Sequence, residues 1–270
     1  MRIAIEHTTH YRFSPGIQAG LQRLRLTPRS VRGQVVSDWS ITVEGARVQL
    51  EYDDHNANRV TLIAFEPGTR EVAIRSGGIV ETTDQAGILG RTPGYLPRWH
   101  FLDPTPLTQV GPRVRALVAR LAPDSNMLAR LHALADLVAG SVTYELGHTD
   151  AASSAEAVLA AGHGVCQDHA HVFIAAARLL GVPARYVSGY LLMDDRVDQE
   201  AGHAWAEAEV EGLGWVGFDI SNRICPDARY VRVASGADYR DAAPVTGIRV
   251  GTSDETMQVR LAVEQQRVEQ

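Results

Sequence analysis

Hydrophobic and polar residues alternate with a period of two through much of residues 1–90. Leu24 and Leu26 alternate with arginines, and residues 48–52 repeat the pattern. The turn-rich letters DDHNAN at 53–58 and the Gly77–Gly78 pair divide the region into short segments. Such alternation is typical of strands with one buried face. We therefore predict an antiparallel, sandwich-like β domain over residues 1–90.

Prolines then recur across residues 91–112. A proline lacks a backbone N–H and fixes φ, so the segment should form neither a regular helix nor a central strand. We predict a linker here, carrying Pro93, Pro97, Pro104, Pro106 and Pro112.

Beyond the linker the hydrophobic period changes to three and four residues, which predicts amphipathic helices over 114–121 and 128–138. Ser153 and Glu156 match a capping box that would open a short helix ending at Ala161. Strand patterns return after Leu180 as ARYVSGYLL, HAWAEAEV and WVGFDI, and the tail 256–264 alternates like an edge strand. We predict a second domain over residues 113–270, with helices packed on an antiparallel sheet. The chain as a whole is expected to be an α+β protein.

Composition narrows the function classes. The chain has 270 residues, a formal charge of −6 and a pI near 5.9, so it lacks the basic character of a nucleic-acid-binding protein. No segment approaches the roughly 20 apolar residues of a membrane span, and the N-terminus does not resemble a signal peptide. We expect no nucleic-acid or membrane partner and a cytoplasmic location. The sequence carries no signal of the oligomeric state.

Cys166 lies in the segment GHGVCQDHAH, just before a predicted helix. The helix is indicated by apolar residues on one face between Val172 and Leu180, and by a stop at Gly181. Unpaired N–H groups and the helix dipole favour an anion at such an N-terminus, so they favour a thiolate nucleophile and could also bind an oxyanion. With only Cys225 besides it, a disulfide framework is excluded, and the expected cytoplasmic setting would keep the cysteines reduced, so at least one thiol is available for chemistry.

Two other interpretations of Cys166 compete. A free cysteine is often a small buried hydrophobe. Alternatively His163, Cys166 and His169, each three residues apart, could bind a metal, but no second paired cluster supplies further ligands. We therefore expect no metal and no organic cofactor.

A thiol enzyme also needs a histidine base and a group that orients it. Alternation in HAWAEAEV places His203 on the face opposite a run of alanines, and the alanine face should pack closely against a helix. Gly212-Leu213-Gly214 then predicts a hairpin.

The orienting residue depends on the register of this hairpin. If Glu211 pairs with Trp215, Asp219 lies opposite Glu207, roughly 13 Å along the strand from His203. A two-residue loop would instead put Asn222 opposite His203. Asp219 and Asn222 are therefore rival candidates.

The blocks around Cys166, GHAWAEAEV and GWVGFDISN together resemble the transglutaminase-like superfamily, whose papain-like core carries a Cys–His–Asp triad in that order. The N-terminal half resembles the bacterial transglutaminase-like N-terminal region. The resemblance implies Cys166 as nucleophile, His203 as general base and acid, and Asp219 as orienting residue. It also suggests supporting roles for Asp168, next to a glutamine that relatives share, and for Tyr190 in the same cleft.

The implied chemistry is acyl transfer through a thioester. We expect a cysteine peptidase or amidase that acts on a peptide or a glutamine- or glutamyl-type amide. Transglutaminase-type transfer to an amine and a non-catalytic peptide-binding module of the same fold are the alternatives. Cys225, which precedes a proline in a predicted loop, is expected to be structural.

Overall fold

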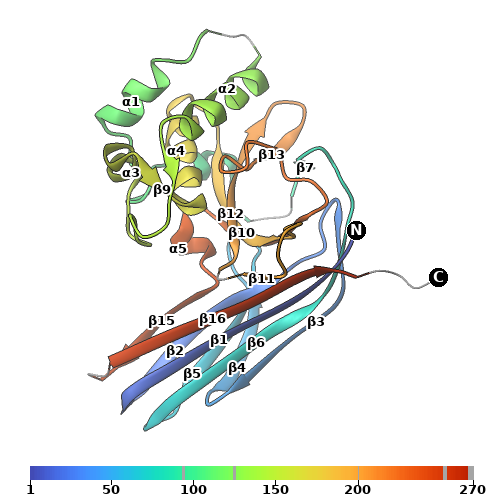
Figure 1. Ribbon diagram of the computed structural model, residues 1–270, viewed down its shortest axis with the longest axis vertical. Coiled ribbons are helices and arrows are strands. Elements are labelled where there is room, and N and C mark those ends of the chain that lie inside the picture. The colour runs from blue at the N-terminus through green and yellow to red at the C-terminus, as the bar shows by residue number, and fades with distance from the viewer. Residues whose placement is uncertain (93–94, 124–125, 200, 252–253, 267–270) are drawn as a thin grey trace, which may run out of the picture.

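The N-terminal strands form two antiparallel sheets that pack face to face (Figure 1). The computed structural model describes residues 1–92, 95–123, 126–199, 201–251 and 254–266. Phe13 and Ile74 of one sheet share an apolar core with Leu24 and Ile63 of the other. The predicted sandwich is confirmed. Its strands from this half are β1 (Arg2–Ile17), β2 (Ala19–Thr27), β3 (Gln34–Glu44), β4 (Arg47–Asp53), β5 (Arg59–Phe65) and β6 (Thr69–Thr82).

The C-terminal segment returns to this sandwich. Strand β15 (Val245–Val250) pairs with β2, and β16 (Asp254–Gln265) pairs with β1 over most of its length. The second domain predicted over residues 113–270 therefore includes two strands, β15 and β16, that in the structure complete the N-terminal sheets. Leu261 and Val263 of β16 are buried in an apolar core, which explains the alternation of the tail.

The proline-rich segment is anchored to the second half of the molecule. Before it, β7 (Ile88–Gly90) pairs with a strand of the second half, β13 (Gly214–Phe218). Within it, the 3₁₀ helix η1 (Arg98–Leu102) sets Phe101 edge-on against Trp215. Helix α1 (Pro112–Val118) then begins with proline, whose missing N–H is not needed at that position. Pro93 lies outside the described residues.

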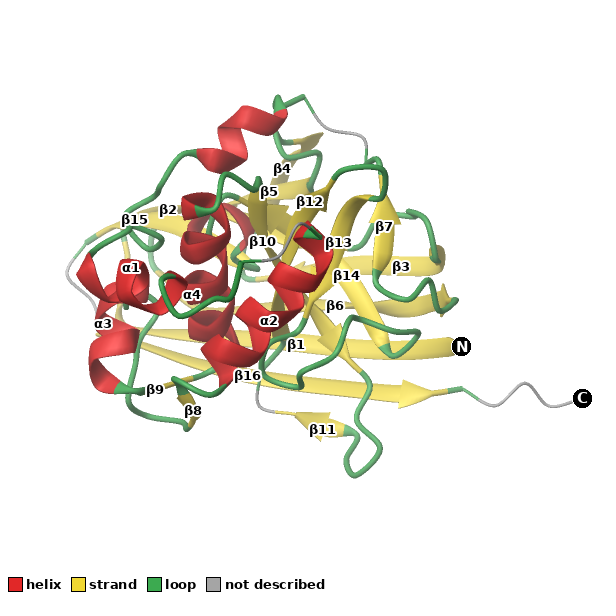
Figure 2. Cartoon of the chain, turned by 90° about the horizontal axis from the view of Figure 1, so that it is seen from above, coloured by secondary structure: helices red, strands yellow, loops and turns green. Residues whose placement is uncertain are grey.

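In the second half a buried helix lies between a sheet and a layer of helices. The sheet has the order β14-β10-β12-β13-β7, with β10 (Ala184–Leu191), β12 (His203–Val210) and β14 (Tyr230–Gly236). Helix α4 (Cys166–Leu179) packs on β12, and α2 (Met127–Ala139) and α3 (Ala155–Ala161) cover it (Figure 2). The alanines of β12 lie in the same core as α4, as predicted from their alternation. The remaining elements are β8 (Thr143–Tyr144), β9 (His163–Gly164), β11 (Asp198–Gln199) and α5 (Tyr239–Ala242).

The cap of α3 differs from the predicted capping box. Ser154, not Ser153, is the N-cap, and its hydroxyl accepts the N–H of Ala157. Glu156 instead accepts backbone N–H groups of Arg113 and Val114 at the start of α1. The acidic side chain therefore joins two helices.

The two halves are held together by an apolar core and by side-chain amides. Ile3, Ile5 and Leu261 of the sandwich pack with Tyr190 and Val231 of the second sheet. Two amide side chains also cover the edge of β14. The Gln34 amide donates to the backbone carbonyl of Arg232 and accepts its backbone N–H. The Asn58 amide makes the same two hydrogen bonds with the backbone of Ser235. These contacts satisfy backbone groups that an unpaired edge would leave open.

Candidate active site

Cys166 is the first residue of α4, which confirms its predicted place at a helix N-terminus. The preceding Val165 is extended and serves as the N-cap. Within the described residues, no protein group accepts a hydrogen bond from the backbone N–H of Cys166 or Gln167. Two donors therefore remain at the start of the helix, beside the thiol, where they could bind a negatively charged oxygen.

His203 is the first residue of β12, and its ring lies between Cys166 and Asp219. The Nε2 atom is 2.6 Å from Asp219 Oδ2, which leaves Nδ1 for the thiol. Burial lowers the pKa of His203, but hydrogen bonds to Asp219 and Cys166 outweigh burial and raise it to about 10. The three residues thus meet although they come from a helix and two different parts of a hairpin.

The hairpin register differs from both expectations. Val210 lies opposite Gly214 and Glu207 opposite Gly217, with Glu211–Leu213 as the loop. Asp219 is thereby two positions, roughly 7 Å, closer to His203 than the Glu211–Trp215 pairing predicted. Strand pairing ends at Phe218, and the chain then turns at Asp219.

Asp219 is buried at the centre of a hydrogen-bond network. Its Oδ2 also accepts the Tyr230 hydroxyl at 2.6 Å and the Asn222 side-chain amide at 2.7 Å. Burial opposes ionisation, but the hydrogen bonds from His203, Tyr230 and Asn222 outweigh it and lower the pKa of Asp219. Asn222 therefore contacts the carboxylate and is not the partner of His203. Sequence reasoning missed Tyr230, because no motif marks the strand that carries it.

Asp168 and Tyr190 support the site from two sides. The buried Asp168 carboxylate accepts the Thr149 hydroxyl at 2.6 Å and the Val165 N–H at 2.8 Å, so it fixes the turn before Cys166. Burial raises the pKa of Asp168. The Tyr190 hydroxyl lies 2.9 Å from His7 Nδ1 and so joins the second sheet to β1.

Among the described residues, His169 and His171 of α4 are not grouped with Cys166 in a cluster that could hold a metal ion. His169 Nδ1 lies 2.8 Å from the Ser221 hydroxyl, and its Nε2 lies 3.0 Å from the Val142 carbonyl oxygen. His171 is buried and accepts the backbone N–H of Tyr239. In the alternative metal site considered from the sequence, His163, Cys166 and His169, both ring nitrogens of His169 are therefore already engaged by protein groups.

A cavity of about 330 Å³ opens at the candidate site, and both halves of the molecule line it. Cys166 and His203 lie in its wall, together with Tyr190 as expected. Tyr186 also lines it, and sequence reasoning did not identify this residue. The sandwich contributes His7, Thr9, Tyr11, Arg25, Leu26, Val245, Met257 and Val259.

Cys225 lies apart from this cavity's lining. Burial raises the pKa of its thiol, which disfavours the reactive thiolate. Both cysteines are free. Cys166 is therefore the better placed nucleophile.

Comparison with known families gives two matches along the chain. Residues 3–81 match the bacterial transglutaminase-like N-terminal region, and residues 115–220 match the transglutaminase-like superfamily. An uncharacterized protein of Mycobacterium leprae is 30% identical over 263 residues, covering 93% of this chain and 94% of the relative. An uncharacterized protein of Mycobacterium tuberculosis is 29% identical over 290 residues, covering 97% and 92%.

A solved structure has the same fold over the whole chain. It is the crystal structure of a "Putative Cysteine Protease" from Cytophaga hutchinsonii, with a TM-score of 0.78 and 24% identity, covering 100% of this chain and 92% of that one. The likeness extends through the sandwich as well as the second half. Among the described residues, no helix is both long and apolar enough to cross a membrane.

Proposed function

Because the chain belongs to the transglutaminase-like superfamily, we propose that it is a thiol-dependent acyl-transfer enzyme, a cysteine peptidase or amidase that hydrolyses a peptide or a glutamine- or glutamyl-type amide. One observation carries the proposal. His203 interacts with both Cys166 and Asp219 in the wall of a cavity, and its pKa is raised to about 10 by those two neighbours. An imidazolium is thus stabilised beside the thiol, as nucleophilic catalysis requires.

In the first half of the reaction, the Cys166 sulfur anion attacks the carbonyl carbon of the amide. The carbonyl π electrons move to oxygen, and the N–H groups of Cys166 and Gln167 donate to that oxyanion. When the C–N bond breaks, His203 gives its proton to the departing amine. The product that remains on the enzyme is a thioester.

In the second half, His203 takes a proton from water as the water oxygen attacks the thioester carbon. The C–S bond breaks, the acid is released and Cys166 is regenerated as the anion beside the imidazolium. Asp219 keeps the ring oriented throughout, through the 2.6 Å contact with Nε2. No cofactor takes part in this scheme.

The cavity favours an uncharged acyl side chain. Arg25 in its wall is buried and paired with Asp54 at 3.0 Å. Burial lowers the pKa of His7 to about 4, so this imidazole is neutral at pH 7. The remaining lining is largely aromatic and aliphatic. A peptide with a neutral residue, glutamine included, on the acyl side of the amide therefore suits the site better than a charged one.

Intact-mass analysis of acid-quenched reactions tests the proposal. A panel of peptides with glutamine, γ-glutamyl and ordinary amide bonds should yield an adduct of acyl-group mass on the wild type and on Cys225→Ala, but not on Cys166→Ala. An adduct that persists in Cys166→Ala would contradict the assignment. Absence of adduct and of turnover with all peptides, together with peptide binding, would favour the non-catalytic module.

The same reactions distinguish water from an amine as acceptor. With a primary amine such as cadaverine present, hydrolysis releases the free acid. Transglutaminase-type transfer instead gives an amide whose mass exceeds that of the acid by the mass of the amine minus one water. We propose that the acid dominates.

We also propose a cytoplasmic location, because two free cysteines suit a reducing compartment. Fractionation of the native host with an antibody to the chain would test this.

A further inference from the structure

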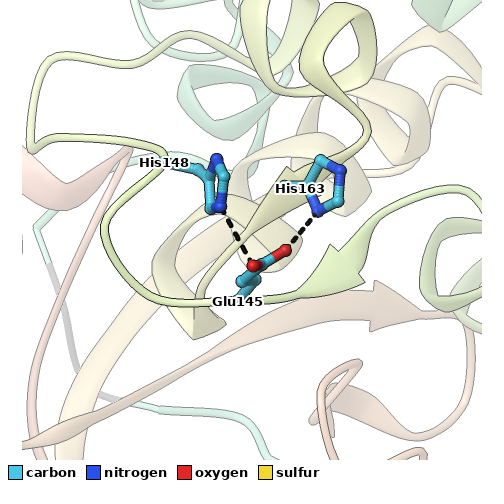
Figure 3. Close-up of side chains that lie close together, drawn as sticks. All are labelled: Glu145, His148 and His163. Atoms are coloured by element: carbon cyan, nitrogen blue, oxygen red, sulfur yellow. Dashed lines mark ion pairs between the residues drawn. The ribbon is translucent and has the colours of Figure 1, made fainter.

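A second cluster of side chains that could bind a ligand lies outside the triad and consists of Glu145, His148 and His163. Figure 3 shows His148 and His163 on either side of Glu145, each with a ring nitrogen toward the carboxylate. His148 Nε2 is 3.1 Å from Glu145 Oε1, and His163 Nδ1 is 2.7 Å from Oε2. One ligand atom from each residue lies within 4.8 Å of the other two.

The backbone fixes this cluster. Strands β8 and β9 pair in parallel, with Thr143 opposite His163, and the Glu145 N–H donates to the Gly164 carbonyl at 2.9 Å. The loop that carries His148 is held one residue later, where Thr149 donates to the buried Asp168. The three side chains therefore project from segments that are tied to each other and to the first turn of α4.

Both histidines contact the Glu145 carboxylate, but the two imidazoles cannot both be cations at this spacing without mutual repulsion. The two imidazole rings stack with centroids 4.9 Å apart, and two stacked imidazolium cations would repel each other. Although His163 Nδ1 is buried and close to Glu145, it makes no aligned hydrogen bond to any described residue. Nδ1 of His163 therefore lies beside the carboxylate without a well-aligned hydrogen bond, so this contact leaves the nitrogen available to a better-placed partner.

We propose that Glu145, His148 and His163 form a binding site for a divalent transition metal ion, with zinc the best match. Two imidazole nitrogens and one carboxylate oxygen are a common zinc donor set, with water in the fourth position. Tetrahedral bonds of about 2.0–2.2 Å separate ligand atoms by roughly 3.4 Å, so the observed contacts need only small side-chain adjustments. All three side chains are between 40% and 49% exposed, so the cluster borders solvent, and an ion would enter it by replacing the direct Glu145–His163 contact that buries Nδ1.

This site acts on the structure around the nucleophile and not on the acyl group. His163 is three residues before Cys166, and β9 leads directly into Val165 and α4. A bound ion would tie the 145–149 loop to that turn and so stabilise the start of the helix. The hard cations Mg²⁺ and Ca²⁺, which prefer oxygen ligands, should bind much less well.

The test is zinc binding to metal-free protein by isothermal titration calorimetry, in a Cys166→Ala background, so that the thiol and His203 cannot supply a rival zinc site. We expect one equivalent of zinc to bind. Adding His148→Ala should weaken binding by more than tenfold, because a direct ligand should matter at least as much as outer-shell partners, whose loss costs about 10- to 100-fold. His55→Ala, which removes an exposed histidine of the sandwich, is the matched control and should bind like the background.

Thermal unfolding gives an independent readout. Excess zinc should raise Tm by several degrees in the Cys166→Ala and His55→Ala proteins, and not in the His148→Ala protein. Circular dichroism of the metal-free variants checks that the exposed loop substitution leaves the fold intact. Failure of zinc to bind, or equal binding with and without His148, would overturn the proposal. Neither outcome bears on the acyl-transfer proposal, which the peptide adducts test separately.

Discussion

Glu207 holds together three strands of the second sheet, and its loss should destabilise the protein strongly. It lies on β12, with its carboxylate 2.6 Å from Arg185 Nε of β10 and 2.9 Å from Arg232 Nε of β14. The side chains of Glu207 and Arg185 are only 3% and 6% exposed. Arg185 also stacks over Trp215, and its Nη2 is already without a hydrogen bond to the described residues. Glu207→Gln would thus leave a buried guanidinium without its carboxylate.

Breaking a buried pair by removing one partner costs about 3–5 kcal/mol of unfolding free energy. For a chain of this size that corresponds to a fall of roughly 6–20 °C in Tm. Differential scanning calorimetry at pH 7 measures the change. Glu81→Gln is the matched control, because its pair with Arg2 is exposed and should contribute at most about 1 kcal/mol.

The stabilisation by Glu207 should also depend on pH in a definite direction. Burial alone would raise the pKa of Glu207, but the charges of Arg185 and Arg232 outweigh it and lower the pKa below 4.5. The stabilisation is therefore fully present above pH 4.5 and is lost as the pH falls through the lowered value. The difference between wild type and Glu207→Gln should shrink on acidification. Equal loss of Tm in Glu207→Gln and Glu81→Gln at pH 7 would refute the reasoning.

Three further predictions concern the site and the contact between the halves. Tyr230→Phe removes one hydrogen bond from the Asp219 carboxylate and should cost about 1.5–3 kcal/mol in urea unfolding at pH 7; an unchanged midpoint would argue against the bond. His203 has a folded-state pKa above its unfolded value of 6.5, so its stabilisation is complete below pH 6.5 and is lost as the pH rises toward 10. The wild type should therefore lose its advantage over His203→Gln across that window, and a constant difference would contradict the shift. Asn58→Ala leaves a backbone N–H and carbonyl of β14 unpaired and should cost about 2–4 kcal/mol, whereas Asn56→Ala, whose side chain bonds to none of the described residues, should cost clearly less.

Local sequence patterns predicted the helices and strands better than they predicted which strands pair with each other. Period-two alternation located most strands, and the change to a helical period located α2 and α4. The alternation of residues 256–264 predicted a strand but not its neighbour, because a half-buried strand can pair with any open edge. The structure pairs it with β1, more than 240 residues away in sequence. Likewise, nothing in the local pattern marks Gln34 or Asn58 as the amides that cover β14.

The same difference between local pattern and long-range pairing applies to the residues of the candidate site. The position of Cys166 at a helix N-terminus could be predicted from neighbouring residues, because a helical hydrophobic pattern follows it, Gly181 ends that pattern and small residues precede it. The position of Asp219 depends on hairpin register, which the turn decides. Gly212 and Gly214 both adopt positive φ, at 80° and 77°, and two nearby glycines leave several loop lengths open to sequence reasoning. Tyr230 reaches Asp219 only because β14 lies across the sheet, which no spacing rule reveals.

The cavity proposed to bind the substrate combines residues that are close in sequence with residues from distant parts of the chain. Its chemistry comes from Cys166 and His203 in the middle of the chain, while part of its wall comes from β1 and β16 near the two ends. Tyr190 contacts His7 across the boundary between the two halves, so a buried hydrogen bond positions this wall relative to the sheet that carries His203. Changes in the sandwich should therefore alter which acyl groups fit before they alter the reactivity of the thiol. In this protein the N-terminal sheets form one side of the cavity that Cys166 and His203 line.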